Sequence, residues 1–78
     1  TTHDVGDTAL VHFVRGAAVG QRNARLFWAA CRAYESGRGD ALSAALTEAA
    51  VATGLPEREA LATIASASRR AARFTSSP

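Results

Sequence analysis

The sequence has no lysine and no methionine, and it contains one cysteine, Cys31, and only two prolines. A single cysteine excludes an internal disulfide and a four-cysteine zinc site. No apolar run approaches the roughly 18 residues needed to cross a bilayer, and the N-terminal stretch lacks the regions of a signal peptide. We therefore expect a cytoplasmic protein without a membrane partner. Because the chain starts Thr1-Thr2-His3 and has no methionine, we interpret it as a piece of a longer polypeptide.

Residues that favour strands are also few, since isoleucine occurs once and aromatic residues make up 6% of the chain. Alanine, the best helix former, supplies 19 of the 78 residues,. A chain of this length forms one small domain that buries only about 60% of its unfolded surface. The composition predicts an all-α domain.

Glycine, proline and acidic residues divide the chain into four helices over about residues 7–16, 21–36, 40–53 and 56–73. Asp7 and Asp40 are predicted N-caps, because a carboxylate accepts from the free N–H groups of a first turn. Gly37 and Gly54 suit helix ends, and Pro56 suits a first turn. We expect a compact four-helix bundle, with a five-helix bundle as the alternative, a core over residues 7–73 and a frayed tail over residues 74–78.

Apolar residues recur at helical spacing in each of these segments, which predicts one buried stripe per helix. The expected core residues are Leu10, Phe13 and Val14; Phe27, Ala30, Cys31 and Tyr34, with Leu26 and Ala33 at the edge; Leu42, Ala45, Leu46, Ala49 and Thr53; and Ala60, Leu61, Ile64, Ala67 and Ala71.

Residue patterns typical of an enzyme are missing. Without lysine there is no lysine-bearing phosphate loop. The spacing of His3, Asp4, Asp7 and His12 matches no defined set of metal ligands,. Cys31 beside an apolar stripe is typical of a buried structural thiol. We therefore expect no catalytic residue, no metal site and no intrinsic cofactor.

The second helix carries the strongest binding pattern. At about 100° per residue, Arg22, Arg25 and Arg32 fall in one sector, and Trp28 lies beside it. An indole between guanidinium groups can stack a nucleobase while the cations hold phosphates. Two structural alternatives stay open: the indole packs on the first helix or on a missing part of the parent protein, and the arginines are merely solvated.

Two further groups of polar residues suit a phosphate-bearing ligand. Asn23 projects toward the apolar side, where its amide needs either a neighbouring helix end, such as the loop of residues 17–20, or a ligand. The free N–H groups at this helix start form a phosphate seat with Arg22. Arginines on the last helix suit a nucleic-acid backbone or, alternatively, only complement the helix dipole; they are Arg58, Arg69, Arg70 and Arg73.

The order of these residues resembles a known family. Gly20-Gln21-Arg22-Asn23-Ala24-Arg25-Leu26 is similar to the Gly-x-Arg-Asn-x-x-Leu opening of the C-terminal helix-bundle domain of phage- and plasmid-type bifunctional primase–polymerases. Ala49-Ala50-(x)3-Gly54-Leu55-Pro56-(x)2-Glu59-Ala60-(x)2-Thr63-Ile64-x-Ser66-Ala67 looks like its closing helix. The resemblance covers about residues 8–73.

This resemblance implies a non-catalytic module of a longer replication protein. Such a module engages single-stranded DNA template and helps hold the initiating nucleotide, ATP or another nucleoside triphosphate with Mg²⁺. A catalytic primase core in the same chain joins the nucleotides, and a helicase domain is a further expected neighbour. The family motif carries a ligand-contact role onto Arg22 and Asn23.

Two other functions fit the same sequence. Ala50, Gly54 and Ala60 or Leu61 match the small-residue pattern of a helix-turn-helix, although Glu57 and Glu59 would then lie against DNA. Alternatively, Trp28 anchors a partner helix in a bundle that serves only protein interaction.

Overall fold

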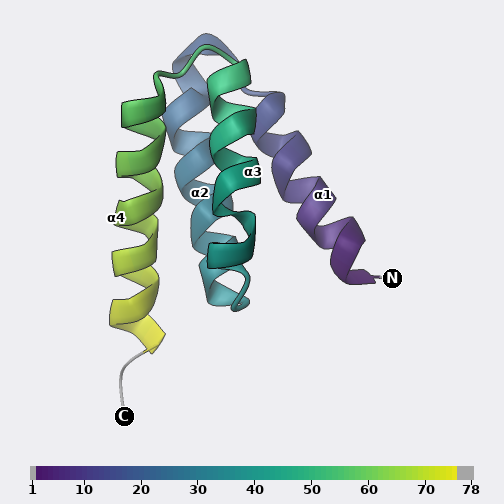
Figure 1. The fold of residues 1–78 in the computed structure, drawn as a ribbon, viewed down its shortest axis with the longest axis vertical. Helices are drawn as coiled ribbons and strands as arrows, with labels where there is room; N and C mark the ends of the chain where they lie inside the picture. The colour runs from purple at the N-terminus through teal and green to yellow at the C-terminus, as the bar shows by residue number, and fades with distance from the viewer. Residues whose placement is uncertain (1, 76–78) are drawn as a thin grey trace.

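Four α-helices and one short 3₁₀ turn make up the part of the chain that the computed structural model describes, residues 2–75, with side chains over residues 6–73. They are α1 (Thr2–Arg15), η1 (Val19–Gln21), α2 (Arg22–Glu35), α3 (Gly39–Ala52) and α4 (Glu57–Thr75). The helices run alternately up and down, so α1 begins and α4 ends toward the same end of the bundle (Figure 1). The all-α four-helix bundle is confirmed.

Glycines close α2 and α3 with the same hydrogen-bond pattern. Gly37 has φ +78° and Gly54 has φ +105°, the left-handed region that glycine adopts without steric cost,. Gly54 N–H donates to the carbonyl of Val51, and Leu55 N–H donates to that of Ala50. Gly37 and the following residue make the equivalent two bonds. These are Schellman motifs, which satisfy the last carbonyls of each helix.

Two predicted helix starts are wrong. α1 begins at Thr2, so Asp7 is not an N-cap; its carboxylate instead accepts hydrogen bonds from Arg38 Nε at 2.8 and 3.0 Å, and from Arg38 Nη2. This ion pair ties α1 to the α2–α3 turn across 31 positions of sequence. Asp40 lies within the first turn of α3, which begins at Gly39, and it still suits the positive end of that helix,.

The predicted frayed tail is also corrected in part. α4 continues through Thr75, so residues 74 and 75 are helical, and residues 76–78 lie outside the described part of the chain. Pro56 immediately precedes α4 rather than lying within it, and its carbonyl accepts from Ala60 N–H at 3.0 Å.

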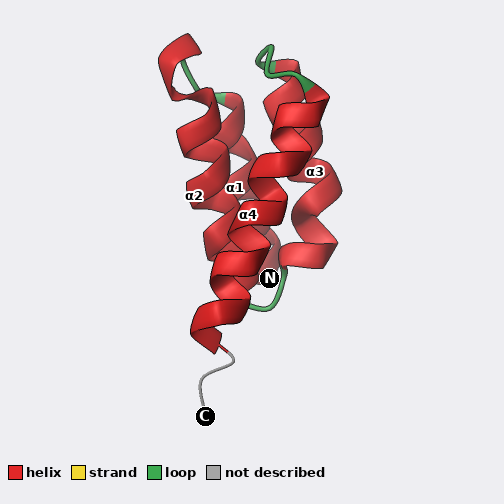
Figure 2. Ribbon diagram, turned by 90° about the vertical axis from the view of Figure 1, so that its left-hand side faces the viewer, coloured by secondary structure: helices red, strands yellow, loops and turns green. Residues whose placement is uncertain are grey.

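α2 and α3 form the centre of the bundle, and each contacts all three other helices. α1 and α4 flank them and do not contact each other within residues 2–75. Figures 1 and 2 show α4 and α1 on opposite sides of the central pair. The bundle measures 39 × 30 × 18 Å, and its short dimension is that of about two helix layers.

Small and medium aliphatic side chains fill the core. Leu26, Ala29, Ala30, Ala33 and Ala49 are fully buried, so the helices approach closely. Leu26 and Ala33, which the sequence places at the edge of α2, are thus central.

Seven predicted core residues are only partly buried or exposed. Phe13 is 36% exposed and Leu61 is 54% exposed, and five others are partly buried: Leu10, Phe27, Tyr34, Ala45 and Thr53. The tight alanine contacts leave little interior volume for large side chains. The aromatic residues and Leu61 therefore lie at helix edges.

Candidate nucleic-acid interface

Two neighbouring aromatic rings lie between two arginines on the α1–α2 surface. The guanidinium carbon of Arg25 lies 4.6 Å from the Phe13 ring centroid. Phe13 and Trp28 have their centroids 4.9 Å apart at an interplanar angle of 56°. The guanidinium carbon of Arg32 lies 5.6 Å from the Trp28 ring centroid. We call these four residues, Arg25, Phe13, Trp28 and Arg32, the aromatic–arginine strip.

α2 supplies three residues of this strip at helical spacing, and the last turn of α1 supplies Phe13. Arg25 and Arg32 lie three residues before and four residues after Trp28, on neighbouring positions of one helix face,. Arg25 Nη1 also donates to the carbonyl of Phe13 at 3.0 Å, in the last turn of α1. A cation there complements both the unpaired carbonyls and the negative end of the helix dipole. The strip is therefore held by two helices.

The strip remains open to solvent. Trp28 is 49% exposed and Phe13 is 36% exposed, so the indole is not enclosed in the core. The Arg32 side chain is 60% exposed, and besides its contact with Trp28 it makes a long ion pair with Glu35, at 3.9 Å. Such a surface pair contributes little, so the Arg32 guanidinium can reorient toward a phosphate at small cost.

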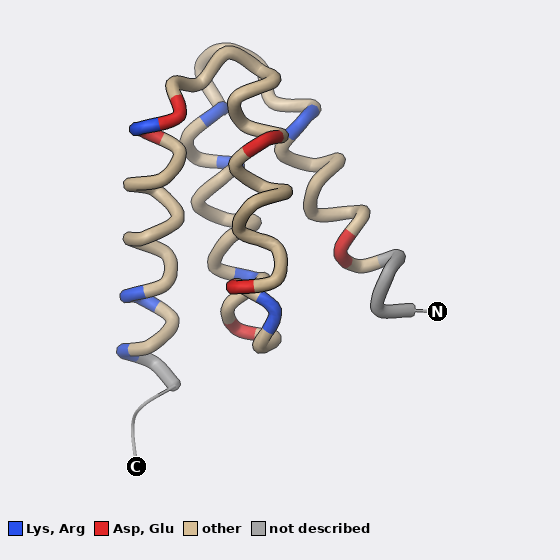
Figure 3. The backbone as a smooth tube through the Cα atoms, in the orientation of Figure 1, with Lys and Arg blue, Asp and Glu red and all other residues tan. Residues whose placement is uncertain are grey.

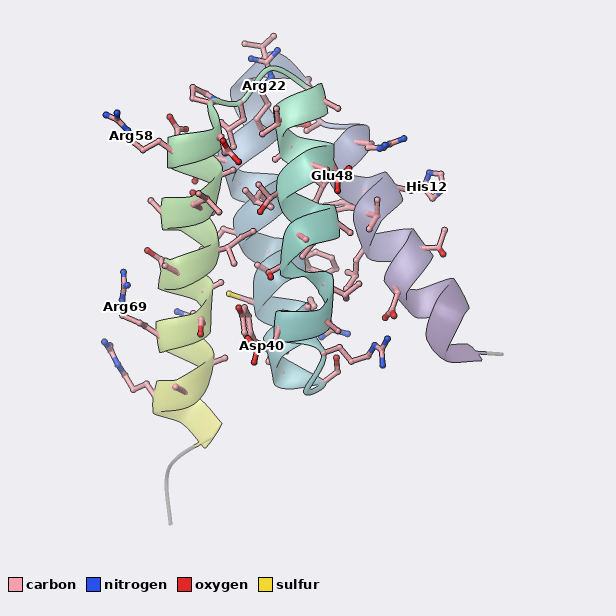
Figure 4. All side chains as sticks on the ribbon, in the orientation of Figure 1. His12, Arg22, Asp40, Glu48, Arg58 and Arg69 are labelled. Carbon is pink, nitrogen blue, oxygen red and sulfur yellow. The ribbon has the colours of Figure 1, made fainter. Side chains whose placement is uncertain are left out.

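Arg22 lies elsewhere, against the α3–α4 turn (Figure 4). A Cβ added to Gly54 would meet Arg22 Nη2 at 3.0 Å and Cζ at 3.2 Å. Arg22 Nε is buried and has no hydrogen-bond partner among the described residues. The predicted single sector of arginines is therefore divided: Arg25 and Arg32 join the strip, and Arg22 lies at the top of the bundle.

The side-chain amide of Asn23 donates hydrogen bonds to α4. Its Nδ2 donates to Thr63 Oγ1 at 2.6 Å and to Glu59 Oε2 at 3.3 Å. Within the described residues the partners of this amide therefore lie on the neighbouring helix α4 and not in the loop of residues 17–20. Asn23 fixes the N-terminus of α2 against α4, which lies 40 positions away in sequence.

The α4 arginines occupy both ends of that helix. Figure 3 shows basic positions at the top and bottom of α4, with acidic positions only at the top. Arg58 stands between Glu57 and Glu59 in sequence and points away from the bundle, as does Arg69 near the other end (Figure 4). Arg69 Nη2 donates to Ser66 Oγ at 3.2 Å. The predicted continuous strip of four cations is therefore two separate groups.

The charge of Arg70 on α4 also acts on the thiol of α2. Burial raises the pKa of the Cys31 thiol, and the positive charge of Arg70 partly opposes this shift. Cys31 is a buried free cysteine at 9% exposure. Its environment is that of a structural thiol, as the sequence predicts.

Sequence reasoning missed Phe13 as a member of the exposed strip. Phe13 shares the i, i+3, i+4 stripe with Leu10 and Val14, which predicts burial. Val14 is fully buried, while Phe13 lies at the stripe's edge. The only sequence signal for its true place is the pairing of two large aromatics on adjacent helices, and that requires the helix packing to be known.

The described residues contain no group of three or more His, Cys, Asp or Glu side chains able to hold a metal ion. The side chains of His3 and Asp4 lie outside the described set. No helix in the described part is both long and apolar enough to span a bilayer. Comparison with protein families, with curated proteins and with solved structures yields no match to this chain.

Proposed function

We propose that this domain binds single-stranded DNA through the aromatic–arginine strip, as a non-catalytic module of a primase–polymerase. The observation that carries the proposal is the pair of exposed rings, Phe13 and Trp28, between the guanidinium groups of Arg25 and Arg32. Nucleobases stack on exposed aromatic faces while cations along the same line contact the backbone phosphates. A single strand suits this surface better than a duplex, because only unpaired bases expose their faces.

A second part of the proposal concerns the initiating nucleoside triphosphate with Mg²⁺. The 3₁₀ turn η1 runs directly into α2 without a side-chain cap. The Arg22 guanidinium lies against Gly54 of the α3–α4 turn and makes no ion pair with the described side chains. A guanidinium without an anionic partner suits a phosphate. Asn23 then acts by positioning the start of α2 against Thr63, since both N–H groups of its amide already have acceptors.

Glu57 and Glu59 weigh against the helix-turn-helix alternative. They lie in the first turn of α4, at the start of the helix that would enter the major groove. Two carboxylates there oppose phosphate and base-edge contacts. A preference for duplex over single-stranded oligonucleotide would nevertheless establish that alternative.

The test is fluorescence anisotropy of labelled oligothymidine titrated with the protein. Trp28→Ala should weaken binding by roughly tenfold, since stacking of one base contributes about 1–3 kcal/mol. Val19→Ala is the matched control, because Val19 is an exposed apolar residue outside the strip at 75% exposure. Equal affinity of the two variants would reject the strip as the binding surface.

The proposed binding of a nucleoside triphosphate is tested separately. We expect ATP with Mg²⁺ to bind the free domain or to strengthen oligothymidine binding, and Arg22→Ala to abolish that effect. Arg15→Ala removes one positive charge from a different site, the hollow that Arg15 lines with Glu48 and Glu57, and is the control. Identical losses in both variants would reduce the role of Arg22 to general charge.

A further inference from the structure

A groove of about 530 Å³ runs between α3 and α4, with Tyr34 of α2 contributing to its lining. Its walls are mainly small or apolar and include Ala44, Leu61, Ile64 and Ala65. The groove is formed by different helix faces from the aromatic–arginine strip and shares no residue with it.

Leu61 is the clearest sign that the groove leaves apolar surface uncovered. It follows the apolar stripe of α4, yet 54% of its surface is exposed, while Ile64 on the same wall is 6% exposed. Small neighbours such as Ala44 and Ala65 leave room for a backbone to approach closely,. An apolar segment placed here would cover Leu61 and extend the existing core.

The dimensions of the groove suit a helix. Its α4 wall extends from Glu57 to Ala65, a length of about 12 Å at the helical rise of about 1.5 Å per residue. The α3 wall from Ser43 to Glu48 lies opposite. This length matches about two turns of an amphipathic helix, whose apolar residues at i, i+3 or i+4, and i+7 fit such a groove.

Charge complementarity defines the chemistry of the occupant. Glu48 and Glu57 line the groove from opposite walls, and Figure 3 shows acidic positions on the upper parts of both helices. Arg15 lines the adjoining hollow with them, but no ion pair joins it to either carboxylate within residues 6–73. Two unpaired carboxylates beside an apolar groove favour a basic residue and oppose a polyanion.

We propose that this groove binds an amphipathic helix of a protein partner, with an apolar stripe about two turns long and an arginine or lysine beside Glu48 and Glu57. The domain then has two separate binding surfaces: the strip on α1 and α2 for nucleic acid, and the α3–α4 groove for a protein helix. The two proposals rest on different residues, so either fails without the other.

The probe is a labelled, alanine-rich helical peptide with a leucine stripe over two turns and an arginine following it. One control peptide has glutamate in place of the arginine, and another has serine in place of the leucines. Binding is measured by anisotropy, and the contact surface is mapped by ¹⁵N–¹H chemical shifts of the protein. We expect shift changes to concentrate on residues 43–48 and 57–65.

Leu61→Ser should weaken binding of the arginine peptide about fivefold, from the loss of a half-buried leucine contact. Val19→Ser, another exposed apolar residue, should leave it unchanged. The glutamate peptide should bind about threefold more weakly at low salt, as expected for a surface ion pair. Equal binding of the arginine and glutamate peptides, shift changes outside the groove, or a Leu61-dependent dimer that excludes the peptide would each overturn the proposal.

Discussion

Gly39→Ala tests the packing of Gly39 against Tyr34. Gly39 is the first residue of α3 and is buried beneath the ring of Tyr34. A Cβ at this position would lie 2.0 Å from Tyr34 Cδ1 and 2.2 Å from Cε1 and Cγ. Because carbon atoms in contact are normally about 3.5–4.0 Å apart, the Tyr34 ring would have to move by about 1.5 Å.

The net effect follows from two opposing terms. Overpacking a well-packed site costs about 1–3 kcal/mol. Replacing glycine by alanine in a compatible backbone stabilises by about 0.4–1 kcal/mol, because the unfolded chain loses freedom. We expect Gly39→Ala to lower the free energy of unfolding by about 1–2 kcal/mol. For a domain of this size each kcal/mol lowers Tm by roughly 4–8 °C.

Urea unfolding followed by circular dichroism measures this change. Gly20→Ala is the control, because its Cβ meets nothing within 4 Å and its φ is not in the positive region; it should be neutral or slightly stabilising. In a Tyr34→Ala background the cost of Gly39→Ala should disappear, since the ring is gone. If Gly39→Ala and Gly20→Ala shift the unfolding midpoint equally, the Tyr34–Gly39 contact is not formed.

Three further changes test other contacts. Gly54→Ala places a side chain at φ +105° and 3.0 Å from Arg22 Nη2, so it should destabilise by about 1–3 kcal/mol in urea unfolding; a neutral result would contradict the left-handed turn. Asn23→Ala removes the bond to Thr63 and should cost about 0.5–1.5 kcal/mol, measured in the same way; unchanged stability would mean that the amide is solvated. Because burial raises the pKa of the Cys31 thiol, iodoacetamide should alkylate the native protein far more slowly than the urea-unfolded chain at mildly alkaline pH. Equal rates would show an exposed thiol.

The helix ends that depend on local backbone conformation could be predicted from sequence. Gly37 and Gly54 each follow a helical stretch and adopt positive φ, as their residue type allows,. α2, α3 and α4 therefore begin and end within a few residues of their predicted bounds. Asp7 shows the limit of this reasoning, since its carboxylate suits a cap but is taken by Arg38, 31 positions away. The choice between a cap and an ion pair depends on how α1 packs.

The candidate site was predictable only where one helix determines it. The spacing of Arg25, Trp28 and Arg32 on α2 needs no tertiary information, and the structure keeps both arginines near the aromatic pair. Phe13 joins them from α1, and Thr63 receives the Asn23 amide from α4. These two contacts are set by the angles between helices, on which the sequence pattern of a single helix carries no information.

Trp28 is the single tryptophan of the chain, so its emission tests the central claim most directly. Titration of the protein with oligothymidine should quench this emission to saturation, because a base stacks on the half-exposed indole. The affinity should fall as salt rises, and Arg25→Gln with Arg32→Gln should reduce that salt dependence, since each lost phosphate contact lowers the slope by about 0.7 for single strands. Emission that stays unchanged at concentrations where oligothymidine binds, or a salt dependence that the two substitutions leave intact, would contradict the account.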